Sequence, residues 1–194
     1  MENIKYQIEF FSDWHIGSGL SIAGDADAAV LKDSKGQPYI PGKTLKGMFR
    51  DAAEQLEEFK EKDSPEHKAW QSFIEEVFGK RVNAGEHEGT AGQCFFSSAT
   101  LSSNLQELFD QEPSLKEGLY RSISSTAISY ETGVAKEHSL RKVEVCAPMV
   151  LEGEIEGEIL AKHKDKLERC SKMIKQMGLS RHRGLGRVQF SFTK

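Results

Sequence analysis

The segment Ile4-Lys5-Tyr6-Gln7-Ile8-Glu9-Phe10 decides the fold of this chain, because apolar and polar side chains alternate along its whole length. Alternation with a period of two predicts a first β-strand with one face in the core and the other in solvent. Working outward from it, β-type patterns predict further strands over 28–32, 94–101, 149–160 and 189–193. The chain therefore contains enough strands for a sheet.

Three segments show helical periodicity instead. Apolar side chains recur at helical spacing over 45–59, 70–78 and 162–177, and Thr44 is the expected N-cap of the first helix. Residues 120–145 contain two β-prone runs, which predict a protruding hairpin.

The order strand, helix, strand, hairpin, strand, helix, strand predicts an α+β fold. Its core should be ferredoxin-like or RNA-recognition-motif-like, with the β-hairpin and loop and helical segments as insertions. We expect a single domain over residues 1–194, with insertions at about 60–92 and the hairpin at about 120–146.

The composition limits the cellular compartments that fit this protein. Of its 194 residues, 38% are hydrophobic, which suffices for a core, and no apolar run is long enough to cross a membrane. The first residues lack the basic-then-apolar layout of a signal peptide. The three cysteines lie far apart, so we expect them to be reduced core residues. These features predict a soluble, cytoplasmic protein without a membrane partner.

A glycine loop near the C-terminus carries Arg181, Arg183 and Arg187. Glycine lets main-chain N–H groups approach phosphates, and guanidinium groups bind phosphate in a bidentate manner. The net charge of −4 is unusual for a nucleic-acid binder, but bases gather at 43–50 and 162–187 while acids gather at 54–76. We therefore expect one face to bind a polyanion and another to stay acidic.

The segment Pro41-Gly42-Lys43-Thr44 resembles a phosphate-binding loop only in part. A Walker A motif requires a glycine at position 37, where this chain has Gln37. Lys43, Thr44, Lys46 and Arg50 still lie at a helix N-terminus, where phosphate is favoured. The alternative, which this segment alone favours, is an ordinary capped helix with solvated lysines. Nor does any Gly-rich segment complete a dinucleotide fingerprint, and the six histidines show no metal-ligand spacing.

Taken together, four segments resemble, in the right order, the RAMP superfamily of CRISPR-associated proteins, and specifically the backbone subunit of type III effector complexes. They are His15-Ile16-Gly17-Ser18-Gly19, the stretch 39–50 around Ile40-Pro41-Gly42, the strand 95–101 and the loop Arg183-Gly184-Leu185-Gly186-Arg187-Val188. Two departures are Lys43-Thr44 in place of Ser-Ser, and Ser98 where the family more commonly has Asp before Ala.

The resemblance also covers residues 127–140, which are similar to the family's thumb hairpin. In relatives, thumbs of neighbouring subunits fold over the guide–target duplex and displace a base pair at regular intervals. The resemblance thus implies RNA contacts by Lys136, His138 and Arg141.

A catalytic residue is also implied, because target-cleaving relatives use an aspartate of the first long loop with a divalent cation. Asp27 is its match by position, and Asp25 is a close competitor. A single carboxylate cannot hold Mg²⁺ alone, so phosphate oxygens and water must complete the octahedron. The metal would activate the 2′-hydroxyl that RNA itself supplies.

We therefore expect a crRNA-binding backbone subunit that stacks head-to-tail with copies of itself, assembles with other type III CRISPR subunits and cleaves bound target RNA with Mg²⁺ through Asp27. Three alternatives stay open: an inactive structural subunit, a metal-independent repeat-processing endoribonuclease with His15 as general acid or base, and a ferredoxin-like module that does not bind RNA. The expected phosphate contacts outside the thumb are His15, Lys43, Thr44, Lys46, Arg50, Arg181, Arg183 and Arg187.

Overall fold

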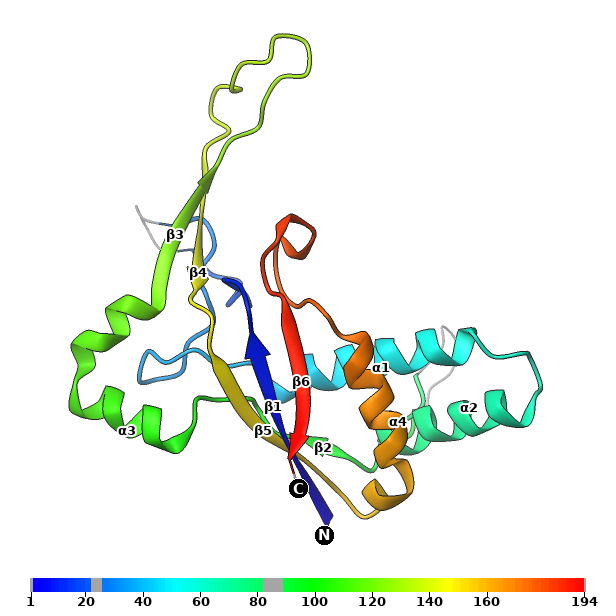
Figure 1. The fold of residues 1–194 in the computed structure, drawn as a ribbon. Helices are drawn as coiled ribbons and strands as arrows, with labels where there is room; N and C mark the ends of the chain where they lie inside the picture. The colour runs from blue at the N-terminus through cyan, green and yellow to red at the C-terminus, as the bar shows by residue number, and fades with distance from the viewer. Residues whose placement is uncertain (1, 22–25, 82–88, 194) are drawn as a thin grey trace.

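The computed structural model describes residues 2–21, 26–81 and 89–193 (Figure 1). Its strands are β1 (Glu2–Phe10), β2 (Phe95–Phe96), β3 (Tyr120–Ser125), β4 (Arg141–Cys146), β5 (Val150–Gly157) and β6 (Val188–Thr193). Its α-helices are α1 (Gly42–Glu58), α2 (Pro65–Phe78), α3 (Ser103–Gln111) and α4 (Leu160–Met173). Two 3₁₀ segments, η1 (Pro113–Leu119) and η2 (Arg181–Arg183), complete the described elements.

A four-stranded antiparallel sheet forms the centre of the molecule, in the order β2-β5-β1-β6. The predicted strand β1 lies inside this sheet and pairs with β5 on one side and with β6 on the other. The segment from α3 to β4 is inserted between β2 and β5. Without it the elements follow a β-α-β-β-α-β order, with α1 and α2 as the first helical unit, so the predicted α+β class is confirmed.

The hydrophobic core lies between this sheet and the helices. Tyr6 and Ile8 of β1 are fully buried on the side that α1 and α4 cover (Figure 1). Phe49 of α1 lies against Phe96 and Phe190, with ring centroids 5.5 and 5.3 Å apart. Edge-to-face and tilted aromatic pairs of this kind stabilise a core beyond their buried area.

The opposite face of the sheet is acidic. In the pairing register, Gln7 lies opposite Glu152 and Lys5 opposite Glu154, and Gln7 donates a hydrogen bond to the Glu152 carboxylate over 2.9 Å. Glu156 continues the row towards Phe95 at the sheet edge. RNA-recognition motifs bind RNA by stacking bases on aromatic side chains of this face. Here a row of carboxylates would repel phosphate, so this face does not suit RNA binding of that kind.

Several element boundaries differ from the predicted ones. The first helix begins at Gly42, with Pro41 rather than Thr44 at the N-cap position and no side-chain cap. The predicted strand 28–32 forms only isolated bridges, and of 94–101 only β2 is a regular strand, although Ala99 and Thr100 still form bridges to other segments. Helix α4 ends at Met173, because Ile174 has extended backbone.

The hairpin of β3 and β4 forms as predicted and projects from the sheet (Figure 1). Its strands pair from Tyr120–Cys146 to Ser125–Arg141. Residues 82–88 of the predicted insertion at about 60–92 lie outside the described residues. Within 2–21, 26–81 and 89–193, no helix combines the length and apolar character that a membrane crossing needs.

We predict that Gly42→Ala destabilises the protein by at least about 2 kcal/mol, because a Cβ atom there would overlap the carbonyl oxygen of Phe96 and lie 2.9 Å from that of Ser97. Gly47→Ala in the same helix is the matched control. Its Cβ would meet nothing within 4 Å, so helix propensity should stabilise the protein by roughly 0.5–1 kcal/mol. Urea unfolding measures both, and equal effects of the two substitutions would contradict the expectation.

Candidate nucleic-acid interface

The foot of the hairpin is fixed to the first long loop by a buried carboxylate. Glu144 of β4 is 7% exposed and accepts hydrogen bonds from the Val30 amide over 2.9 Å and from Lys32 Nζ over 2.7 Å. The Glu144 amide in turn donates to the Ala28 carbonyl. These bonds hold residues 28–32 beside β4 although they form no regular strand.

His15 lies at the same junction. Its ring is 3% exposed, and Nδ1 lies 2.6 Å from the Glu144 carbonyl oxygen. Because a carbonyl oxygen can only accept, Nδ1 must carry a hydrogen and donate it to Glu144. The ring is thus held by the hairpin foot, and its predicted contact with RNA stays a prediction.

The glycine loop after α4 lies on the first loop. The Leu179 amide donates to the His15 carbonyl, and the Gly186 amide donates to the Asp13 carbonyl. Gly186 has a φ of 65°, and a Cβ atom there would overlap the Met177 carbonyl, so only glycine fits. Main-chain bonds therefore fix this loop in position before any ligand binds.

The three arginines of this loop face solvent. Arg181, Arg183 and Arg187 are exposed, and no acidic side chain in the described ranges forms an ion pair with them. Arg181 also lines a hollow of about 430 Å³ between α1 and α4, together with Met48. Unpaired guanidinium groups on a fixed loop are available to an anion.

The cations of α1 differ in their availability. Lys46 Nζ donates to the Cys94 carbonyl over 2.8 Å, and burial lowers the pKa of Lys46. Arg50 forms an ion pair with Glu54 over 2.8 Å. Lys43 is exposed and unpaired among the described residues, and Thr44 is partly exposed. Lys46 and Arg50 therefore already have intramolecular partners, whereas Lys43 does not.

The N-terminus of α1 is also occupied. The Gly42 amide donates to Ser98 Oγ over 3.3 Å, and the glycine packs on the backbone of β2. A phosphate therefore cannot sit against this amide as it does in a phosphate-binding loop. The structure thus agrees with the exclusion of a Walker A site.

Asp27 lies beside the hairpin foot. Its Oδ2 accepts a hydrogen bond from the Lys142 amide over 2.8 Å, while its own amide donates to the Lys142 carbonyl. Asp27, His15 and Leu179 line one hollow of about 430 Å³. The structure thus brings together the predicted catalytic residue, the predicted histidine and the start of the arginine loop.

The divalent cation expected at Asp27 has few protein ligands available. The described residues contain no group of three or more His, Cys, Asp or Glu side chains that could hold a metal ion. Asp25, the competitor of Asp27, lies outside the described residues. The exposed Asp27 carboxylate fits a Mg²⁺ ion that takes most of its ligands from phosphate and water, because Mg²⁺ keeps several waters in many sites.

The thumb residues are divided between the paired strands of the hairpin and its tip. Lys136 and His138 lie in the exposed tip, where His138 has a φ of 56°. Arg141 begins β4 and precedes Lys142, whose backbone binds Asp27. Arg141 therefore lies in the outermost pair of the β3–β4 ladder, opposite Ser125, while Lys136 and His138 lie beyond it in the tip.

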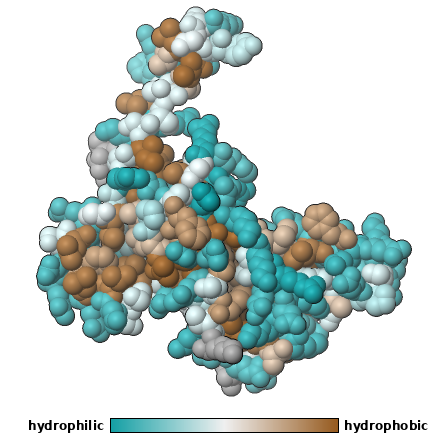
Figure 2. All heavy atoms as spheres, in the orientation of Figure 1, coloured by the Kyte–Doolittle hydropathy of each residue, from teal (hydrophilic) through white to brown (hydrophobic). Residues whose placement is uncertain are grey.

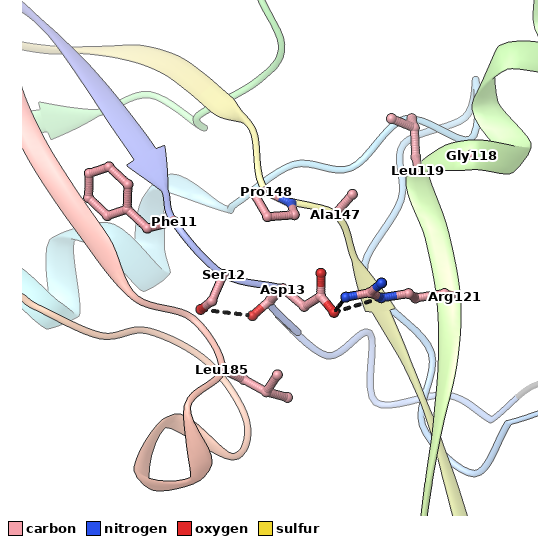
Figure 3. A pocket seen from close by; sticks show the side chains of 9 residues that line it. All are labelled: Phe11, Ser12, Asp13, Gly118, Leu119, Arg121, Ala147, Pro148 and Leu185. Carbon is pink, nitrogen blue, oxygen red and sulfur yellow. Dashed lines mark hydrogen bonds and ion pairs between the residues drawn. The ribbon is translucent and has the colours of Figure 1, made fainter.

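Two buried acids escaped prediction from the sequence. Glu144 resembles an outward-facing residue of an alternating strand, and Asp13 resembles a loop residue, yet both are 7% exposed. Asp13 accepts a hydrogen bond from Arg121 Nε over 2.7 Å, and Arg121 Nη2 donates to the same oxygen (Figure 3). A partner more than 100 residues away gives no signal in a single sequence.

An antiparallel α+β core, an inserted hairpin and a basic glycine loop at the hairpin foot define the class of this protein. A family model matches residues 7–189, and that model describes the RAMP superfamily. The chain belongs to the RAMP superfamily.

Solved structures share the fold. One is described as type III-B Cmr-beta in the apo state (14% identity, TM-score 0.68) and another as type III-B Cmr-beta bound to cognate target RNA (13% identity, TM-score 0.69). Both alignments cover 99% of this chain and 97% of the other chain. A search of curated proteins finds no matching sequence.

We predict that Glu144→Gln lowers the free energy of unfolding by about 1–3 kcal/mol, because the amide keeps the shape of the side chain but loses the charge that pairs with Lys32. Hydrogen exchange of the Val30 amide should accelerate as well. Glu158→Gln, at an exposed position, is the control and should change stability by less than about 0.5 kcal/mol. An unchanged Val30 exchange rate in Glu144→Gln would contradict this role.

Proposed function

We propose that the chain is a crRNA-binding backbone subunit of a type III CRISPR effector complex. The observation that supports this most is the set of unpaired arginines on a fixed glycine loop, beside the hollow lined by His15 and Asp27. Such a surface positions a phosphate backbone without reading its sequence. The fold of this chain is also similar to that of a chain in type III-B Cmr-beta bound to cognate target RNA, and this similarity supports the same proposal.

The proposed phosphate contacts fall into two groups. Lys43, Arg181, Arg183 and Arg187 are exposed and unpaired among the described residues, so they can bind phosphate without losing a protein contact. His15, Lys46 and Arg50 would have to exchange or share existing contacts, which costs binding energy. We assign the main electrostatic contribution to the first group, with Arg141 and the thumb tip as further contacts.

We further propose that the subunit stacks head-to-tail along the RNA with copies of itself and meets other type III subunits at its ends. An open, heterologous interface can join an acidic surface to a basic one. The acidic open face of the sheet and the basic hairpin foot supply such complementary surfaces on one chain. This arrangement would let a chain of net charge −4 bind RNA.

For target cleavage we propose Asp27 as the ligand of a divalent cation, Mg²⁺. When bound, the metal would stabilise charge on the scissile phosphate and favour deprotonation of the 2′-hydroxyl. Asp27 would contribute its carboxylate charge, and the Lys142 amide would fix the direction of that carboxylate through Oδ2. Hydrogen bonding to the backbone is a common means of orienting a metal ligand.

The second candidate function is an inactive structural subunit. It is favoured by the lack of a three-ligand cluster in the described part of the chain and by the structural bond that Asp27 already makes. The third candidate function is metal-independent cleavage with His15 as general acid or base. Only Nε2 could then transfer a proton, because Nδ1 donates to the Glu144 carbonyl.

We predict that Asp27→Asn reduces target cleavage in the assembled complex by roughly 100-fold or more, because the charge that attracts the metal is lost. An asparagine oxygen can still accept from the Lys142 amide, so folding and crRNA binding should be retained. Cleavage of labelled target RNA at several Mg²⁺ concentrations measures the loss.

Two further variants test which of the two neighbouring aspartates supports cleavage. Asp27→Ala removes the charge and the hydrogen bond together, and Asp25→Ala tests the neighbouring carboxylate. Cleavage that persists in Asp27→Asn and disappears in Asp25→Ala would assign the chemistry to Asp25. Cleavage undiminished by EDTA would exclude the metal mechanism altogether.

We also predict that Arg183→Ala weakens binding to single-stranded RNA of any sequence. Each phosphate contact contributes about 0.7 to the slope of log affinity against log salt, so the slope should fall by about that amount. Arg169→Ala, an exposed arginine on α4 outside the proposed contacts, is the matched control and should leave the slope unchanged. Titrations at several salt concentrations distinguish the two, and identical slopes for both variants would remove Arg183 from the site.

A further inference from the structure

The face formed by α3 and η1 exposes aliphatic side chains that the core does not use. Both elements belong to the segment inserted between β2 and β5. Phe109 is the buried residue of α3 and joins this helix to the core. Leu105 and Leu108 of α3 are 37% and 41% exposed, and Leu115 of η1 is 42% exposed. Figure 2 shows hydrophobic side chains gathered over this part of the molecule. The three leucines are therefore available to a partner.

The leucines are arranged as a helix-binding surface. Leu105 and Leu108 are three residues apart on α3, so they lie on the same face of the helix. The Leu115 amide donates to the carbonyl of Glu112, the residue that ends α3, so η1 continues directly from the helix. Aliphatic side chains at this spacing form ridges into which the side chains of a second helix pack.

Carboxylates lie next to these leucines. Glu107, Glu112 and Glu117 are exposed, and no cationic side chain among the described residues forms an ion pair with them. Lys116, the lysine of η1, donates to a main-chain carbonyl instead. The α3–η1 face therefore combines an apolar centre with an acidic rim.

Nucleic acid does not suit this face. The carboxylates repel phosphate, and the aromatic side chain of α3, Phe109, is buried and cannot stack on a base. A second copy of the chain also suits it less than another protein does. The basic helix α4 is the obvious complement, but of its large apolar side chains only Met173 is exposed. A copy thus offers the charge without the apolar strip.

We propose that the α3–η1 face binds an α-helix of a different protein, one that presents aliphatic side chains flanked by lysines or arginines. The leucines would supply the dry centre of the contact, where most of the binding energy is concentrated. The three glutamates would pair with the flanking cations, which sets the orientation of the helix and excludes acidic helices. This site goes beyond the proposed RNA binding, because it uses none of the proposed RNA contacts.

The test uses the full chain and three synthetic helical peptides of equal length. The first carries leucines at helical spacing flanked by lysines, the second has glutamates in place of the lysines, and the third has alanines in place of the leucines. Fluorescence anisotropy at fixed salt should show roughly tenfold tighter binding of the first peptide than of either other peptide, because both the apolar centre and the charged rim are needed.

Variants of the chain then locate the contact. Leu108→Gln should weaken binding of the leucine–lysine peptide by roughly fivefold or more, because a central aliphatic contact is lost. Met173→Gln is the control at an apolar position of nearly equal exposure, and its affinity should stay that of the unmodified chain. Urea unfolding checks that both variants are folded.

A second pair of variants tests the rim without touching an apolar side chain. Glu107→Lys should weaken binding roughly threefold and reduce its dependence on salt, because a rim carboxylate is replaced by a like charge. Glu158→Lys makes the same change of net charge at an exposed site outside the face and should have no effect.

Distinct results overturn distinct claims. Equal binding of the lysine and glutamate peptides, or unchanged binding in both Leu108→Gln and Glu107→Lys, would overturn the proposed site. Self-association of the chain that sedimentation detects and that Leu108→Gln abolishes would assign the face to a second copy and overturn it as well. Displacement of the peptide by oligouridine would place the peptide on the RNA surface instead. A chain that binds the peptide as expected but binds no RNA would contradict the proposed function alone.

Discussion

The buried carboxylate of Glu144 is the constraint on which the hairpin foot depends. It binds the Val30 amide and Lys32 through its side chain, while its carbonyl accepts from His15. A carboxylate that is 7% exposed is stable only when its hydrogen bonds are made, so the three segments must meet in one arrangement. The glycine loop is joined to the same arrangement, because Leu179 binds the His15 carbonyl.

Acidic and basic side chains gather on different surfaces of this chain. The open face of the sheet carries the row Glu152, Glu154 and Glu156, and the glycine loop carries three arginines that form no ion pair with another described residue. Net charge averages these regions and therefore says little about a partner. The fold has the element order of an RNA-recognition motif, whereas the proposed RNA contacts lie at the end of the sheet, where main-chain and guanidinium donors are concentrated.

The sequence predicts the parts of the fold that depend on local periodicity. β1, the core of α1 and the hairpin follow from the spacing of apolar residues. The prediction of an N-cap at Thr44 and that of a strand over 28–32 were wrong, because tertiary contacts set the structure there. These contacts are the packing of Gly42 on β2 and the hydrogen bond from Val30 to Glu144. At the site, exposed arginines on a glycine loop were predictable, whereas the long-range partners of Asp13 and Glu144 were not.

Two hollows at the hairpin foot differ in chemistry. The one that Asp27 lines contains the His15 ring and a carboxylate bonded to the Lys142 amide, and it is the hollow proposed above for the metal ion and the target phosphate. The other contains the Arg121 guanidinium, which Asp13 orients, between apolar side chains such as Phe11 and Leu185. Since β3 lines one and the loop held against β4 lines the other, a shift of the hairpin would change both hollows together. The paired strands join the two hollows, because Lys142, whose amide binds the Asp27 carboxylate, lies directly opposite Ser124 in the ladder.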